Sequence, residues 1–487
     1  FGRTDARLSE SDRAEAEQYL YQQLAAKEES IDLTKYSIAK EEIASFVHGV
    51  INEYPDLYFV TGGFRSYSNN AGNVTSILPQ YTSGYDDDAF QAMLQDALSV
   101  VDNSMSELEK AIALHDYIVV NCEYDYENYL ANKLPREVYS AYGVLVDRKA
   151  VCQGYALAYK LLLNRVGIEC YMVTSSAMNH AWNLIKLDGQ YYQVDTTWDD
   201  PVWDRLGMVG HNYMFLSDGV FQTESDVRKD HHDWVITKGS LTVDLTADST
   251  RFDNEFWISC KSPIILDDGK CYYIDSSGDY RGYGSIKERD LSAGAESVLL
   301  NPIGRWTASN GGYWQGAYSG LFDMGDRLYY NTPTNICSIP IGGGEARTET
   351  AVLSSGDKYV YGVALRQGKI DYLLKTSPND NKGDILPATL EQDVQVPVTK
   401  IVLDREEITM TVGETTQLSA RLYPTYGEQV EVSWTSDNEA VATVKAGLVT
   451  AVAEGNCTIT ASAGGKSAAC KVQVSDETVS PERPDKP

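Results

Sequence analysis

The sequence carries VCQGYALAYKLLL at positions 151–163 and NHAWNLIKLDGQYYQVDTTWDDP at positions 179–201. In the first stretch, apolar residues recur at helical spacing after Cys152 and stop near Gly167, which predicts a helix that begins at the cysteine. The unpaired N–H groups and the dipole at a helix N-terminus stabilise negative charge, so they favour a thiolate there. Cys152 is therefore the candidate nucleophile.

The second stretch predicts a β-hairpin, because Asp188 and Gly189 form a two-residue turn signal between two β-rich runs. This turn fixes a register in which His180 and Asp195 are diagonal neighbours on one face of the sheet. Such neighbours lie about 7–8 Å apart between backbones, within reach of an imidazole and a carboxylate. We expect Asp195 to orient His180, and His180 to accept the proton of the Cys152 thiol.

The motifs VCQGYA, NHAWN and YYQVDTTW resemble those of the transglutaminase-like superfamily, whose members are relatives of papain-fold cysteine peptidases. The resemblance covers roughly residues 105–216. It implies an α+β papain-like core in which the family's nucleophile falls on Cys152, its base on His180 and its orienting acid on Asp195.

The sequence leaves open which side chain helps to stabilise the oxyanion and which residues line the substrate cleft. Animal transglutaminases use a tryptophan upstream of the cysteine for the oxyanion, and papain-type peptidases use a glutamine. The candidates here are Tyr139, Tyr142 and Gln153, in addition to the backbone N–H of the nucleophile. Trp182 and Trp198 flank the predicted base and acid, and are candidates both for the core and for the cleft.

Two further histidine positions lie downstream of the motifs. His211, which follows Gly210, is left open as a residue near the site. The pair His231-His232 in KDHHDW predicts a solvated turn rather than a metal site, because no cysteine or regularly spaced carboxylate set accompanies it. Neither a metal ion nor a cofactor is predicted.

The charge of the chain limits its partners. Its 487 residues contain 41 Lys and Arg against 70 Asp and Glu, a formal net charge of -29. This charge argues against nucleic acid and anionic membranes as partners. No apolar run reaches the roughly 18 residues of a membrane span, so no transmembrane segment is predicted.

The eight cysteines are too few for a disulfide scaffold in a chain of this length, and they form no C-x-x-C pair. Cys457 and Cys470 flank a turn symmetrically, so they are either one disulfide bond or two reduced, buried thiols. Cys260 and Cys271 form a second pair of this type.

From about residue 241 the sequence changes to strands and turns, and a turn followed by an aromatic strand recurs at Asp268, Gly325 and Gln367. The repeat resembles β-propeller blades, but three units do not close a usual propeller of about four to eight blades. We expect a small β-sheet domain that spaces or covers the enzyme, with ligand binding left open.

Residues 398–474 contain VTKIVL (398–403), VGETTQL (412–418), VSWTSD (432–437) and GLVTAVAEG (447–455), and they resemble the bacterial immunoglobulin-like domain of group two. About seven short alternating strands independently predict a β-sandwich with a buried tryptophan, Trp434. In that family the module typically occurs on surface proteins as a spacer or adhesive. The resemblance therefore implies a location outside the cell or on its surface.

The predicted fold class is multidomain, with a papain-like α+β core, an all-β repeat domain and a β-sandwich. The expected segments are an N-terminal helical and α+β extension packed on the core (1–104), the catalytic domain (105–240), the β-rich domain (241–393), the sandwich (398–475) and a proline-rich tail (476–487). Such a tail is typical of a link to a further module or a wall anchor.

Together these features predict a secreted or surface-attached bacterial cysteine enzyme that acts on amide bonds. Proteins and peptidoglycan peptides both fit an exposed location. Hydrolysis is slightly favoured over transfer of the acyl group to an amine, a choice that depends on cleft shape and water exclusion. The alternative is a surface binding or adhesion protein that keeps this fold without turnover, and the intact triad argues against it.

Overall fold

The computed structural model describes residues 9–102, 104–203, 205–226, 228–276, 283–308, 310–392, 394–428 and 430–476. They form two compact units. The larger unit contains the described residues up to Phe322 with Leu328–Ala364 and Ile370–Thr389, and the smaller unit contains Asp323–Arg327, Leu365–Lys369 and the described residues from Leu390 on. The predicted tail from residue 477 on lies outside the described residues. No described helix is long and apolar enough to cross a membrane.

The N-terminal segment packs two helices against a small antiparallel sheet. Ser9 caps the first helix by accepting the N–H of Asp12 with its side chain. Leu20 and Phe46, one from each helix, are fully buried in the same hydrophobic core as residues of the central helix described below. The elements are α1 (Glu10–Ala25), β1 (Ile31–Asp32), the 3-10 turn η1 (Thr34–Tyr36), α2 (Ile43–Glu53), the 3-10 turn η2 (Pro55–Leu57), β2 (Val60–Ser68) and β3 (Val74–Tyr81).

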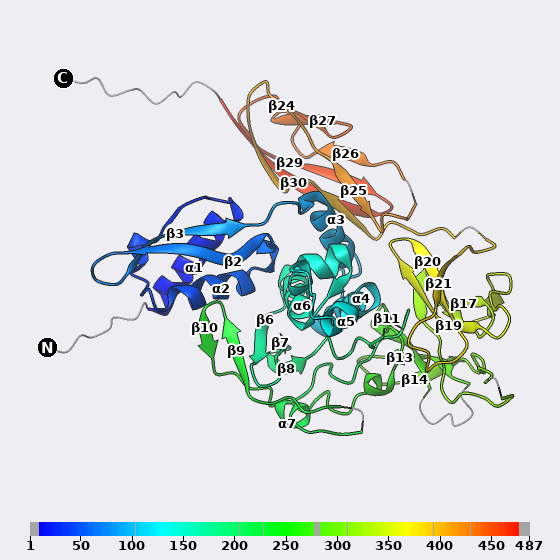
Figure 1. The fold of residues 1–487 in the computed structure, drawn as a ribbon. Helices are drawn as coiled ribbons and strands as arrows, with labels where there is room; N and C mark the ends of the chain where they lie inside the picture. Colours follow the sequence, from blue (N-terminus) through cyan, green and yellow to red (C-terminus); the bar gives the residue numbers. More distant parts are fainter. Residues whose placement is uncertain are drawn as a thin grey trace, which may run out of the picture. The chain divides into compact units, whose positions relative to one another are not determined.

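The next segment is helical, and it contains the central helix α6 (Cys152–Arg165). α6 begins at Cys152, which confirms the predicted helix start. It lies against α4 (Glu107–Asn121) and against strands β6 (Cys170–Ser175) and β7 (His180–Leu187) (Figure 1), and it is buried on almost all sides because it sits between layers. The other elements are α3 (Asp87–Leu98), α4 (Glu107–Asn121), β4 (Glu123–Tyr124), α5 (Tyr126–Leu130), η3 (Glu137–Tyr139), the π-helical turn η4 (Gly143–Asp147) and β5 (Lys149–Ala150).

A five-stranded antiparallel sheet in the order β10-β9-β6-β7-β8 follows α6. Leu187 pairs with Gln190 across the turn, so the predicted hairpin register is confirmed. Asp188 and Gly189 both have positive φ, 49° and 78°, as a two-residue hairpin turn of this kind requires. The elements are β6 (Cys170–Ser175), β7 (His180–Leu187), β8 (Gln190–Val194), α7 (Asp218–Phe221), β9 (Trp234–Lys238) and β10 (Leu241–Val243).

The predicted turn-and-strand repeat corresponds to three separate sheets. Cys260, Cys271 and Tyr273 at the start of this region belong to the same hydrophobic core as α6, so the first of these sheets is anchored on the helical segment. The elements are η5 (Phe256–Ser259), β11 (Ile265–Asp267), β12 (Lys270–Asp275), β13 (Ser285–Asp290), β14 (Glu296–Leu300), β15 (Leu321–Met324), β16 (Arg327–Asn331), β17 (Ile336–Pro340), β18 (Arg347–Thr348), β19 (Tyr359–Arg366), β20 (Lys369–Lys375) and β21 (Asp384–Ala388).

The C-terminal strands enclose a hydrophobic core of their own. Trp434 is only partly buried at the edge of this core, so the prediction of a buried tryptophan was wrong. Cys457 and Cys470 are free thiols, because the register of β29 with β30 puts Ile459, not Cys457, opposite Cys470. Cys260 and Cys271 are also free. The strands are β22 (Lys400–Leu403), β23 (Glu407–Thr411), β24 (Thr415–Gln417), β25 (Ala420–Tyr423), β26 (Ser433–Ser436), β27 (Ala442–Lys445), β28 (Leu448–Ala451), β29 (Gly455–Ala463) and β30 (Lys466–Ser475).

Candidate active site

Cys152 is the first residue of α6 and is partly exposed. The preceding Val151 is extended, and its N–H donates to the carbonyl of Val138 at 2.9 Å, which fixes where the helix starts. Gly154 permits a close approach there, since an added Cβ would overlap the carbonyl oxygen of Val138. The first N–H groups of a helix have no partner within the helix, so those of α6 are available to an anion beside the thiol.

His180 and Asp195 meet at the open end of the β7–β8 hairpin. Nε2 of His180 lies 2.6 Å from Oδ2 of Asp195. The His180 ring also interacts with the Cys152 thiol. Nε2 of His180 contacts the carboxylate of Asp195, so the other ring nitrogen, Nδ1, is the one that can bond to the sulfur of Cys152. The three predicted residues therefore form one connected group, in the order thiol, imidazole, carboxylate.

The positive charge favoured on His180 and the negative charge on Asp195 stabilise each other. Burial disfavours a charged imidazole, but the Asp195 carboxylate and the Cys152 thiol outweigh it and raise the pKa of His180 to about 10. Burial alone would raise the pKa of Asp195, but His180 and the neighbouring His231 hold it well below its ordinary range. These neighbours favour the imidazolium form of His180 at neutral pH, beside an ionised Asp195 carboxylate.

Backbone groups fix the other oxygen of Asp195. Oδ1 accepts the N–H groups of Thr197 and Trp198 at 3.0 and 3.2 Å. The Asp195 N–H donates to the carbonyl of Tyr213 at 3.1 Å. The carboxylate is fully buried, and these bonds keep Oδ2 directed at the imidazole.

His231 is a part of the site that the sequence did not reveal. The predicted solvated turn was wrong for His231, which is fully buried and places Nε2 2.9 Å from Oδ2 of Asp195. His232 is exposed and contacts Asp230. The reason is tertiary, because β9 pairs with β6 and so carries the residues just before it to the open end of the hairpin. Nothing in the local sequence signals a partner 36 positions away.

Aromatic rings enclose the two imidazoles. Trp198 lies over His180 at a centroid distance of 5.2 Å and over His231 at 4.3 Å. Trp182 is buried beside His180, and its Nε1 donates to the side chain of Gln193. Both tryptophans thus shape the surroundings of His180, and Trp182 belongs to the core.

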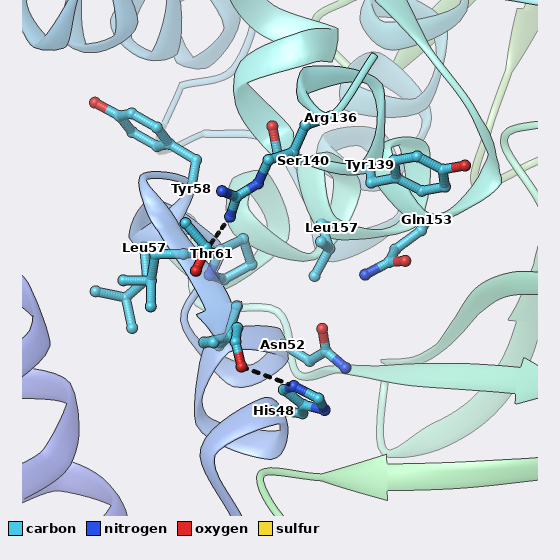
Figure 2. Close-up of a pocket in the computed structure, with 14 residues that line it drawn as sticks. His48, Asn52, Leu57, Tyr58, Thr61, Arg136, Tyr139, Ser140, Gln153 and Leu157 are labelled. Atoms are coloured by element: carbon cyan, nitrogen blue, oxygen red, sulfur yellow. Dashed lines mark hydrogen bonds between the residues drawn. The ribbon is translucent and has the colours of Figure 1, made fainter. Parts of the chain in front are cut away.

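The oxyanion candidates lie in different places. Tyr142 is not brought to the site, because its ring packs in an aromatic cluster with Tyr58 and Tyr85, and its hydroxyl accepts the N–H of Asp86. Gln153 follows the nucleophile and lines a pocket of about 360 Å³ next to it, together with Tyr139 (Figure 2).

A second buried cluster lies behind the site and contains His211, which is therefore not beside Cys152. Nδ1 and Nε2 of His115 contact carboxylate oxygens of Asp116 and Asp199 at 2.8 and 3.2 Å, and His211 contacts the same oxygen of Asp116 at 3.0 Å. Burial opposes the charge on His115, but the two carboxylates raise its pKa to about 9. The N–H of Asp199 donates to the carbonyl of Asp195, so this cluster anchors the loop that carries the acid.

The four side chains of this cluster contact one another through their ring nitrogens and carboxylate oxygens. His115 contacts a different carboxylate with each ring nitrogen, and one ligand atom each of His115, Asp116 and His211 lie within 4.8 Å of one another. Burial raises the pKa of Asp116, but the two histidines outweigh it and lower it to about 2. The cluster therefore holds charge through hydrogen bonds.

Two segments of the chain match the families that their sequence motifs resemble. Residues 95–196 match the Transglutaminase-like superfamily, and residues 397–472 match the Bacterial Ig-like domain (group 2). Residues 95–196 are a transglutaminase-like segment. The match ends just after Asp195, so it includes Cys152 and His180 as well, but not His231.

Among curated proteins, the kyphoscoliosis peptidases of Mus musculus and Homo sapiens are 25% and 23% identical to this chain over 170 residues. The matches cover 31% of this chain and 25% of each relative, so the chain spans about a quarter of the length of these relatives. A solved structure of a TGase is 17% identical, covers 28% of this chain and 44% of its own, and has a TM-score of 0.20. Domains 4 and 5 of the S-layer protein SbsC are 26% identical, cover 22% of this chain and 65% of their own, and have a TM-score of 0.16.

Proposed function

We propose that this chain is a cysteine enzyme that attacks amide bonds of proteins or peptides through Cys152, His180 and Asp195. The observation that carries the proposal is the 2.6 Å contact between His180 and Asp195, on a ring whose other nitrogen is left for a thiol at a helix N-terminus. The match of residues 95–196 to a superfamily of cysteine enzymes supports it.

The reaction begins from a thiolate, after the proton of the Cys152 thiol has moved to His180. The sulfur forms a bond to the carbonyl carbon of the amide, and the electron pair of the C=O π bond moves onto the oxygen. The developing oxyanion is stabilised by the free N–H groups at the start of α6. The His180 imidazolium gives its proton to the amide nitrogen, the C–N bond breaks, and an amine leaves behind a thioester on Cys152. Neutral His180 then takes a proton from the acceptor, whose oxygen or nitrogen displaces the sulfur.

Either water or an amine can serve as the acceptor in this scheme. Water gives a carboxylic acid and makes the enzyme a peptidase or amidase, whereas a lysine-type amine gives a new amide. We slightly favour hydrolysis, because Cys152 is partly exposed and a site that excludes water is needed to protect a thioester.

The proposed setting is the outside or the surface of a bacterial cell, with protein or peptidoglycan peptides as substrates. The support is the Ig-like segment at 397–472, whose family is named as bacterial. Attachment to a cell wall through regions beyond the described residues belongs to the same proposal.

The test is substrate profiling with a peptide library, with and without an added primary amine. Release of carboxylic acid identifies hydrolysis, and incorporation of the amine identifies transfer. The matched control is Cys152→Ala, which keeps the fold and removes the nucleophile. If the wild type shows no turnover and its thiol reacts no faster than an unstructured one, the chain is a surface binding protein and the proposal is wrong.

A further inference from the structure

The pocket beside Gln153 has two walls from distant parts of the chain. One wall comes from α2, η2 and β2, and contributes His48, Asn52 and Thr61. The other comes from η3 and the first turns of α6, and contributes Tyr139 and Gln153. Figure 2 shows the amides of Asn52 and Gln153 facing the space between these walls. The first wall lies outside residues 95–196, so the match to the superfamily does not account for it.

The pocket adjoins the nucleophile. Gln153 is the next residue after Cys152, and Leu157 both lines the pocket and belongs to the small apolar cluster on which Cys152 packs. Tyr139 lines the pocket near Tyr124, which also interacts with the Cys152 thiol. The pocket therefore lies beside the thiol that would react with a substrate carbonyl carbon.

The lining is polar but offers little free charge. None of its 14 described residues is a carboxylate. The single guanidinium, of Arg136, donates to the carbonyl of Val60 at 2.7 Å and to the hydroxyl of Thr82. Among the described residues, the amides of Asn52 and Gln153 have no hydrogen-bond partner. Free amide groups, which both donate and accept, match the N–H and C=O groups of a peptide.

Apolar side chains complete the pocket and define the kind of residue it takes. Ile51, Leu57, Val60 and Leu157 provide surface for carbon atoms of a side chain. The net charge of -29 disfavours anionic ligands at long range. The combination of free amides with apolar surface favours an uncharged peptide segment over an acidic or basic one.

We propose that this pocket is the substrate subsite next to Cys152, that it binds an uncharged peptide segment, and that the N-terminal helix α2 supplies its recognition wall. This inference rests on the proposed function, because it assumes that Cys152 is the nucleophile. It adds that a segment outside the superfamily match selects the substrate.

Two reagents that alkylate the same thiol separate recognition from reactivity. Iodoacetamide is too small to need the pocket, whereas a tripeptidyl chloromethyl ketone with uncharged side chains has to occupy it. Asn52→Tyr fills the pocket from α2, and Asn52→Ala removes only the amide. Ala44→Tyr is the matched control, because Ala44 is exposed on the same helix and does not line the pocket.

We expect Asn52→Tyr to slow labelling by the peptidyl reagent about tenfold. This change corresponds to the loss of roughly one or two net hydrogen bonds and their contact surface. Asn52→Ala should give a smaller loss in the same direction. Labelling by iodoacetamide should stay within about twofold for both, and Ala44→Tyr should change neither rate. Peptidyl reagents that carry a glutamate or a lysine should react more slowly with the wild type than the uncharged one.

The outcomes that overturn this inference differ from those that overturn the proposed function. Unchanged peptidyl labelling in Asn52→Tyr shows that the pocket is not the subsite, even though the thiol is reactive. If a charged peptidyl reagent labels the wild type faster than the uncharged one, the pocket does not prefer an uncharged peptide segment. A wild type that reacts with neither reagent overturns both the function and the subsite.

Discussion

His231 donates its Nε2–H to the same oxygen of Asp195 that His180 contacts, at 2.9 Å. Within the described part of the chain, Nδ1 of His231 is buried and has no hydrogen-bond partner, so the contact with Asp195 is the polar contact that holds this ring. Asp195 is thus held between two imidazoles, of which one faces the thiol. We therefore expect His231 to act through Asp195, as a positioning residue.

His231→Phe should therefore slow alkylation of Cys152 at pH 6 about tenfold, because Asp195 loses a buried donor and orients His180 less well; such a bond contributes about 1.5–3 kcal/mol. His231→Gln should keep most of the rate, since its amide can donate from a similar place. The measurement is the iodoacetamide rate against pH, beside the melting temperature. Equal losses in both variants would mean that His231 only fills space.

Substitution of the three residues of the proposed triad should reduce turnover to different extents. Cys152→Ala should abolish turnover of any peptide substrate, because no neighbouring group replaces the nucleophile. His180→Ala should be nearly as severe, since the proton donor and acceptor are both lost. Asp195→Asn should reduce turnover less than either of these substitutions and leave the chain folded. Wild-type turnover in all three variants would contradict the assignment.

The protonated His180 should also keep Cys152 reactive in mild acid. The pKa of His180 is about 10, so the ring stays charged at pH 6 and stabilises the thiolate. Alkylation by iodoacetamide should therefore remain measurable at pH 6 in the wild type, and in His180→Ala it should fall to the part sustained by the start of α6. The same profile in both proteins would indicate an incidental cysteine.

The buried His115 should make stability depend on pH in a defined direction. Its pKa in the folded chain is raised to about 9, above the ordinary value of 6.5, so folding favours its protonated form. This contribution is fully present below about pH 6.5 and is lost as the pH rises through about 9. The wild type should thus exceed His115→Gln in melting temperature most at pH 6, with a difference that shrinks towards pH 10. A constant difference over this range would show that His115 is not charged.

Removal of residues 398–487 should leave a folded, reactive enzyme. The buried apolar residues from Val398 to Val474 form a separate core, so the larger unit loses none of its own core when they are removed. The truncated chain should keep a cooperative melting transition and the wild-type alkylation rate of Cys152. Loss of either would show that the C-terminal strands are an integral part of the enzyme.

The sequence by itself determined the features that depend on neighbouring residues. The turn at Asp188-Gly189 fixes the register of β7 with β8, because both residues accept positive φ, and the register brings His180 to Asp195. Apolar periodicity places Cys152 at the start of α6. The strand pattern from residue 398 on predicts the separate sandwich core.

Only the tertiary structure decided which distant residues complete the site. His231 reaches Asp195 because β9 pairs with β6, and His211 joins Asp116 across 95 positions. The pocket wall on α2 meets α6 through a shared core. Such contacts follow from how layers pack rather than from local spacing, and a lone histidine or asparagine looks the same in sequence whether it faces water or a buried carboxylate.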